Sequence, residues 1–365
     1  MSTRQRKDLS DGARGIGALA CLLLALLSVG WIIRDLGIAQ QPADVWWTWL
    51  GEARRPGEFT AWATSALDPL LVLGALTAAV TALRAASSVV SGALLAVGAA
   101  TLLLRLPLLW VLGASWLQGL ESGLTGRARL TAGTQIALAA VLVVVVAAGR
   151  RPDGSAQRGL RGVARTAYGV VHRPPSQASG GMPGRPRKGP AVALGVLLAT
   201  SGLAVAAWEA HWLLRLGWDT YRKGLLGDAS VFRVLLQPPV HWQAAALALL
   251  ALTGAAAAVR RASWARPAAM AAGALLFAQA AAALAFAGAT GQLDRFPVLP
   301  GQAQLELGTA LWVAAAGLAA VVVAARPGVP DESRDAVAAV AYGASPGAER
   351  PPHAPPPPST LPPGW

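Results

Sequence analysis

An internal repeat is the feature that most constrains the fold of this chain. Residues 71–87 (LVLGALTAAVTALRAAS) align without a gap with residues 247–263 (LALLALTGAAAAVRRAS), and ten of the seventeen positions are identical. Residues 130–152 align in the same way with residues 305–327 and share Gly-Thr and Arg-Pro positions. Repeats of this kind set the architecture of a protein. The sequence therefore predicts two copies of one unit.

The repeated unit is a membrane unit, because the composition excludes a soluble domain. Hydrophobic residues make up 54% of the chain and charged residues only 13%, whereas a soluble domain has about 25% charged residues. Several apolar runs reach the roughly 20 residues that cross a hydrocarbon core of ~30 Å. The expected spans are residues 15–33, 61–83, 88–110, 130–149, 191–210, 242–259, 267–289 and 307–325.

Four spans in each copy determine the relation between the copies. Because four is an even number, the second copy enters the membrane in the same orientation as the first. The predicted fold class is all-α: a polytopic membrane protein with eight transmembrane helices, arranged as two tandem parallel four-helix repeats. The expected regions are an N-terminus (1–14), a first repeat (15–149), a basic linker (150–190), a second repeat (191–325) and a Pro-rich disordered tail (326–365).

Positive charge orients the spans. With a cytoplasmic N-terminus, 20 of the 31 Lys and Arg residues lie inside and 11 outside, as the positive-inside rule requires. Trp residues gather at the outer ends of the spans, where the membrane interface favours them. We expect a protein of the plasma (inner) membrane with both termini cytoplasmic. The preference for Arg over Lys, with abundant Ala and Gly, indicates a GC-rich bacterial genome.

Most signatures of enzymes are missing from the sequence. It has no Walker-type glycine loop, no His-Glu-x-x-His and no Cys pair, so we expect a non-enzymatic protein without a cofactor. The single Cys21 excludes a disulfide or a thiolate metal cluster within the chain. The net charge of +13 lies in the tails and in a loop beside the spans, which favours anionic lipid over nucleic acid as the partner.

Asp68 is the one acidic residue expected deep in a span, about 10 Å along the helix from residue 61. A carboxylate there costs a few kcal/mol and usually faces protein or water. Arg105, near the outer end of the neighbouring third span, is its predicted partner. The repeat alignments place Ala244 and Phe286 at the equivalent positions, so this intramembrane charge pair distinguishes the halves. It could be a fixed tie or a proton or cation site; we expect the tie.

Three polar residues form a second candidate, the expected outer-face polar cluster. Glu209, His211 and His241 lie at the outer ends of the fifth and sixth spans. They could form a metal or proton site, or they could be polar tips that anchor helix ends; we expect the tips and no metal. Gln135 and Gln279, inside spans, are expected to bridge helices by hydrogen bonds.

The linker contains a cationic amphipathic segment, residues 159–173 (GLRGVARTAYGVVHR). Arg161 and Arg165 lie on its polar side and Arg158 directly precedes it. A helix of this kind would lie on the cytoplasmic leaflet and contact anionic lipids. The alternative is a flexible linker whose charge only sets the topology. Both interpretations are open.

Function is the least determined property. The sequence favours an integral plasma-membrane protein that anchors or organises a membrane-associated complex, with a protein partner on the Pro-rich tail. The alternative is a transporter or permease for a small solute or lipid, with a path between the repeats. A metal- or haem-binding membrane protein is the third candidate. No motif sets the oligomeric state.

Overall fold

The structure is a computed structural model that describes residues 7–51, 60–84, 88–117, 120, 123–152 and 185–328. All of these residues belong to one compact unit, Met1–Val329. Its elements are β1 (Lys7–Leu9), α1 (Asp11–Ile38), α2 (Pro42–Trp49), α3 (Leu67–Arg84), α4 (Ser88–Arg105), α5 (Leu108–Val111), η1 (Ser115–Leu117), α6 (Leu124–Ala148), β2 (Arg150–Pro152), α8 (Lys188–Leu216), α9 (Trp218–Leu226), α10 (Val240–Val259), α11 (Ala265–Ala289), η3 (Phe296–Val298) and α12 (Gly301–Ala325).

Eight helices in the described part of the chain are long and apolar enough to cross a membrane. They are α1, α3, α4 (which continues towards α5 as Val89–Val111), α6, α8, α10, α11 and α12. The shortest, α3, has 18 residues and is ~27 Å long at 1.5 Å per residue, close to the thickness of a hydrocarbon core. These helices confirm the expected all-helical class.

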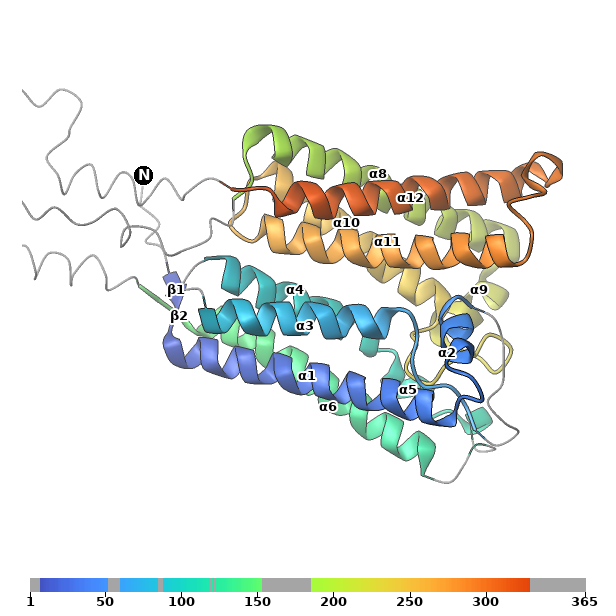
Figure 1. Ribbon diagram of the computed structural model, residues 1–365, viewed down its shortest axis with the longest axis horizontal. Coiled ribbons are helices and arrows are strands. Elements are labelled where there is room, and N and C mark those ends of the chain that lie inside the picture. Colours follow the sequence, from blue (N-terminus) through green and yellow to red (C-terminus); the bar gives the residue numbers. More distant parts are fainter. Residues whose placement is uncertain are drawn as a thin grey trace, which may run out of the picture. The chain divides into compact units, whose positions relative to one another are not determined.

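The helices pack in the same order in the two halves of the chain. In the first half α1 contacts α3 and α6, and α4 contacts the same two helices. In the second half α8 contacts α10 and α12, and α11 contacts the same two helices (Figure 1). Helix α4 packs on α11, and this contact joins the halves.

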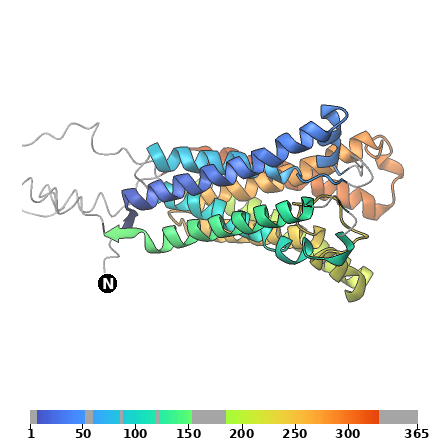
Figure 2. The same ribbon diagram turned by 90° about the horizontal axis from the view of Figure 1, so that it is seen from below.

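One end of the bundle, here the basic end, holds the starts of α1, α4, α8 and α11 and the ends of α3, α6, α10 and α12 (Figure 1). Strands β1 and β2 pair antiparallel there and join the start of α1 to the end of α6 (Figure 2). Arg14 donates to the carbonyl oxygen of Ala82 at 3.1 Å, and Arg266 donates to that of Ala324 at 2.8 Å. Both arginines thus satisfy carbonyl groups that a helix C-terminus leaves free.

The opposite end, here the loop end, carries α2, α5, α9 and residues 227–239. Apolar side chains from both halves share a core cluster that extends towards it, including Leu67 and Leu104 from the first half and Leu194 and Leu276 from the second. A further cluster at the loop end joins residues of α5 and α6 to Leu235 and Leu236. The boundary between the halves is therefore packed with side chains.

The second span begins later than expected. Residues 60–65 are not helical, and α3 begins only at Leu67. Asp68 therefore lies in the first turn of α3, not ~10 Å inside a helix, which corrects the sequence-based expectation. The cause is Pro69, which has no N–H to donate and whose ring clashes with the carbonyl group four residues earlier in a helix, so a helix tolerates it only in the first turn.

The first span continues further than expected. Helix α1 runs to Ile38, so Arg34 and Asp35 are helical and do not begin a loop. Helix α6 likewise starts at Leu124, ahead of residue 130, and includes Arg127 and Arg129. The periodicity of apolar residues stops at a charged residue, but a helix continues wherever that charge finds a partner at the membrane interface.

Candidate functional site

Asp68 and Arg105 form a buried ion pair between α3 and α4. Arg105 donates through Nη2 to Asp68 Oδ1, and the side chains are 1% and 0% exposed, respectively. The other carboxylate oxygen accepts hydrogen bonds from the backbone N–H of Ser65 at 2.8 Å and from its hydroxyl at 3.2 Å. Arg105 also donates through Nη1 to the carbonyl oxygen of Leu236. One arginine thus connects α3, α4 and the loop of the second half.

A neutral pair joins the second and third spanning helices of the second half. Gln243 on α10 donates from Nε2 to Oε1 of Gln279 on α11 at 2.5 Å. These residues are 36 positions apart in the chain, and Asp68 and Arg105 are 37 apart. Each half therefore has a polar side-chain contact between its second and third spanning helices. The repeat alignments placed Ala244 and Phe286 opposite Asp68 and Arg105, so Gln243 lies one residue and Gln279 seven residues from the aligned positions.

Asp35 is a buried carboxylate that the sequence analysis did not identify. It is 0% exposed and lies in the last turn of α1. It accepts from the backbone N–H groups of Ala63 and Thr64 at 3.0 and 2.7 Å, and from the Thr64 hydroxyl at 2.7 Å. Arg34 forms an ion pair with it at 2.8 Å. The feature of the sequence that could have indicated this site is the Arg34-Asp35 dipeptide, which directly follows an apolar run.

Asp35 fastens a buried segment of irregular backbone. Residues 61–65 are all buried, although they are not helical. The N–H groups of Ala63 and Thr64 bond to Asp35, and that of Ser65 bonds to Asp68. Two carbonyl groups accept from the second half: Leu235 N–H bonds to Trp62 O and Leu236 N–H to Ala63 O, both at 2.9 Å. Irregular backbone is tolerated at a membrane only where protein or water satisfies it, and these contacts supply that satisfaction.

The expected outer-face cluster is only partly brought together. His241 Nδ1 lies 3.0 Å from Glu209 Oε2, and the Tyr221 hydroxyl donates to the same oxygen at 2.9 Å. The imidazole of His241 stacks on the Tyr221 ring, with centroids 4.3 Å apart. Burial, and next the hydrogen bond to the Glu209 carboxylate, raise the pKa of Tyr221 to about 12.

His211 does not join this contact. Its ring lies against Trp208 and Trp212, with centroid distances of 5.4 and 5.5 Å. Glu209 and His211 are two residues apart on α8, so they point to different sides of the helix. Among the described residues, no three His, Cys, Asp or Glu side chains are placed to hold a metal ion. Tyr221, which the sequence analysis did not consider, takes the third position in the contact.

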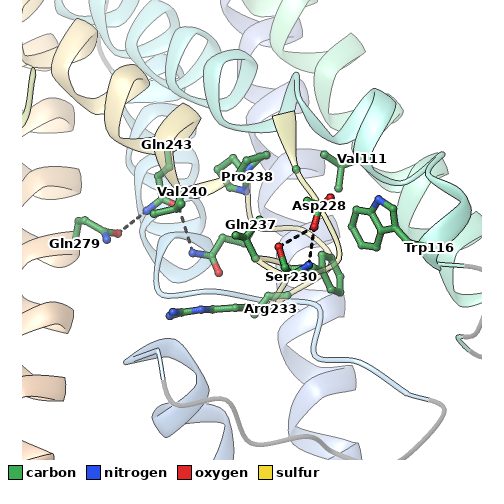
Figure 3. Close-up of a pocket in the computed structure, with 15 residues that line it drawn as sticks. Val111, Trp116, Asp228, Ser230, Arg233, Gln237, Pro238, Val240, Gln243 and Gln279 are labelled. Atoms are coloured by element: carbon green, nitrogen blue, oxygen red, sulfur yellow. Dashed lines mark hydrogen bonds between the residues drawn. The ribbon is translucent and has the colours of Figure 1, made fainter. Parts of the chain in front are cut away.

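A pocket of about 410 Å³ opens at the loop end. Residues 227–240 form most of its wall, Val111 and Trp116 from the first half close one side, and Gln243 and Gln279 lie at the other (Figure 3). Asp228 Oδ1 accepts from the Ser230 N–H and hydroxyl at 2.9 and 2.7 Å, and these bonds lower the pKa of Asp228.

No protein-family model, curated protein or solved structure matches this chain. The functional conclusion therefore rests on the residues described above.

The remaining expected sites lie outside the described residues. They are the linker arginines Arg158, Arg161 and Arg165 and the Pro-rich tail. Of the two glutamines expected to bridge helices, Gln279 contacts Gln243, and Gln135 on α6 donates to the hydroxyl of Ser28 on α1 at 3.0 Å.

Proposed function

We propose that this protein is a multi-pass plasma-membrane protein that anchors or organises a membrane-associated complex. The main support for this proposal is the contact of Arg105, which is buried in the first half and donates a hydrogen bond to the Leu236 carbonyl of the second half. A protein that passes a solute between its halves must separate them at one end and then at the other. Fastening the loop end with a buried arginine opposes that motion.

Further contacts between the halves support a rigid body. The indole N–H of Trp242 donates to the Leu103 carbonyl at 2.7 Å, and that of Trp110 donates to the Leu226 carbonyl at 2.8 Å. At the basic end α4 approaches α11 so closely that a Cβ on Gly92 would lie 3.0 Å from Trp264 Cα. Close packing at both ends favours the anchoring function over transport, because transport requires the halves to move.

The two halves are proposed to be tandem parallel repeats. The same helix pairings in both halves support this, as do the Asp68–Arg105 and Gln243–Gln279 contacts at nearly equal separations. In this arrangement the first copy carries an ion pair where the second carries two amides. We regard the ion pair as a fixed tie, because both side chains are almost completely withdrawn from solvent.

The basic end is proposed to face the cytoplasm. Its described cationic side chains are Arg14, Arg84, Arg185, Arg187, Lys188, Arg260, Arg261, Arg266 and Arg326. Asp11 is the one acidic side chain described beside them, whereas the loop end mixes both signs of charge. This asymmetry follows the positive-inside rule and supports cytoplasmic termini. The linker, through Arg158, Arg161 and Arg165, is proposed to contact anionic lipids, and the Pro-rich tail to bind a protein partner.

A transporter is the second candidate, and the pocket at the loop end favours it. The pocket lies where residues of both halves meet, as a substrate site between repeats would. In that case the structure represents a state in which the basic end is closed. The two functions differ in whether the halves must move.

A disulfide between the halves separates the two functions. A Cβ on Gly92 would lie 3.1 Å from the Trp264 Cβ, so a shift of a few tenths of an ångström brings the pair to the Cβ–Cβ separation of a disulfide, roughly 3.5–4.5 Å. We expect the oxidised Gly92→Cys/Trp264→Cys protein, with Cys21→Ser, to retain its membrane partners in affinity purification. Deleting residues 345–365 should remove those partners and leave the bundle inserted.

The matched control is a disulfide inside the second half. Gly202→Cys/Ala251→Cys joins α8 to α10, and a Cβ on Gly202 would lie 3.1 Å from Ala251 Cβ. Solute flux is then measured in proteoliposomes. If the first disulfide stops a flux that the second leaves intact, the protein is a transporter and the anchoring function is wrong. If the truncated protein retains its partners, the Pro-rich tail does not bind them.

A further inference from the structure

The pocket at the loop end reaches an amide that lies inside a span. Gln279 lines the pocket and precedes the end of α11 by ten residues, about 15 Å along the helix. Its side chain is exposed. An exposed polar group at hydrocarbon depth is costly unless it faces a cavity that holds water or a ligand. The pocket therefore extends from the loops at this end to a polar side chain within a spanning helix.

Three glutamines form a chain of hydrogen bonds along this recess. Gln237 Nε2 donates to Gln243 Oε1 at 3.4 Å, and Gln243 Nε2 donates to Gln279 Oε1 at 2.5 Å (Figure 3). They come from residues 227–239, from α10 and from α11. Each amide offers two donors and an acceptor with two lone pairs, so the chain retains both donors and acceptors for a ligand.

The charges of the lining favour a ligand without net charge. Asp228 and Arg233 are the ionisable residues among those that line the pocket, and their charges cancel. Apolar surface faces the other side of the recess: Trp116 packs edge-to-face on Phe232 with centroids 5.2 Å apart. A volume of about 410 Å³ lies in the range of roughly 300–1,000 Å³ that small-molecule sites occupy.

We propose that this pocket binds a neutral polyhydroxylated group, a glycosyl unit, either free or as a lipid headgroup. Hydroxyl groups donate and accept as the three amides do, and the C–H faces of a sugar ring suit the apolar wall formed by Trp116 and Phe232. An anionic headgroup would meet Asp228 as well as Arg233. A purely apolar chain would leave unused the donors and acceptors that the three amides do not spend on one another. This inference does not depend on the anchoring function.

The test uses the full-length protein purified in an amine-oxide detergent, because a maltoside detergent would itself offer a sugar to the site. The protein is placed in phosphatidylcholine nanodiscs that contain equal amounts of a monoglucosyl diacylglycerol, phosphatidylglycerol and diacylglycerol. Native mass spectrometry then measures which lipid is retained. We expect retention of the glucosyl lipid about tenfold above the other two, since tenfold corresponds to roughly one additional hydrogen bond.

Matched variants locate the site. Gln243→Leu and Trp116→Leu should lose the preference, whereas Gln302→Leu and Trp312→Leu, which change the same residue types on α12 outside the pocket, should keep it. If Gln243→Leu fails to fold, judged by its elution volume and helical circular dichroism, Gln237→Leu in the loop replaces it.

The source of the sugar is decided by adding maltose. Displacement of the glucosyl lipid, or binding of maltose alone by calorimetry, assigns the site to a soluble saccharide; retention of the lipid despite maltose assigns it to a glycolipid. The proposal is overturned if the glucosyl lipid is retained no better than diacylglycerol and maltose does not bind. Preferential retention of phosphatidylglycerol, or an equal preference in Gln243→Leu and Gln237→Leu, also overturns it.

Discussion

Arg105 and Asp68 pair with almost no contact with solvent, and Arg105 also holds the Leu236 carbonyl of the other half. The arginine therefore contributes both to the first half and to its junction with the second. Removing one member of such a pair leaves an uncompensated buried charge, which costs about 3–5 kcal/mol.

The first prediction concerns this pair. Arg105→Gln and Asp68→Asn should each lower the unfolding midpoint strongly, whereas the double variant should recover part of the loss, because two amides satisfy each other at Gln243 and Gln279. The measurement is thermal unfolding in detergent, arranged as a double-mutant cycle. Additive losses would contradict the coupling.

A charge swap of Asp68 and Arg105 is not expected to restore the pair. A carboxylate at position 105 would face the Leu236 carbonyl, and an arginine at position 68 would lose the bonds from Ser65. The swapped protein should therefore be no more stable than the single variants. The neutral double variant is the informative test of the pairing.

The second prediction concerns Asp35. Asp35→Asn keeps the shape but replaces an ionised acceptor of bonds from Ala63, Thr64 and Arg34. Hydrogen bonds to a charged group are each worth about 1.5–3 kcal/mol, so we expect a loss of about 3 kcal/mol or more. Asp44→Asn, in the first turn of α2, where Asp44 accepts from the Gln41 N–H, is the control and should cost about 1 kcal/mol or less. Equal unfolding midpoints for the two variants would contradict the role of Asp35.

The third prediction concerns the contact between α11 and α12. A Cβ on Gly317 would lie 2.7 Å from the Gly273 carbonyl oxygen and 2.8 Å from the Phe277 nitrogen. Gly317→Ala should therefore cost about 1–3 kcal/mol through overpacking. Gly308→Ala on the same helix meets open space and should be neutral or stabilising by up to about 1 kcal/mol. Thermal unfolding of the two alanine variants gives the comparison.

The fourth prediction concerns the pH dependence of Tyr221. Its pKa lies at about 12 in the folded protein, against an ordinary value of 10.0. Burial, and next the contact with Glu209, cause this shift. The stability linked to it is therefore fully present below pH 10.0 and is lost as the pH rises towards 12, because only the unfolded state releases the proton in that interval. Absorbance titration at tyrosinate wavelengths should show a late component that Tyr221→Phe removes. A late component that persists in the variant would contradict the assignment.

The fifth prediction concerns orientation. In a Cys21→Ser background, a cysteine at Thr220, on the exposed side of α9, should react with a membrane-impermeant thiol reagent in intact cells. A cysteine at Ser263, in the turn between α10 and α11, should react only after the cells are opened. The reverse pattern would invert the topology inferred from the positive charges.

The sequence alone determined the helical membrane class, because apolar runs of about 20 residues have few other stable arrangements. It also drew attention to Asp68 and Arg105, since an isolated acid and base near apolar runs are costly without partners. The ends of the helices could not be predicted as well, because the periodicity of apolar residues did not reveal that α3 starts at Leu67 or that α1 extends to Ile38.

Only the tertiary structure decided which polar groups meet. Asp35 was hidden because its partners are the N–H groups of Ala63 and Thr64, and backbone donors leave no mark in a sequence. Tyr221 displaced His211 from the contact with Glu209 because α9 folds back against α8 and α10. Gln237, Gln243 and Gln279 come together from three separate segments. Such contacts depend on the relative placement of whole helices, which the packing of the two halves determines and local residue patterns do not encode.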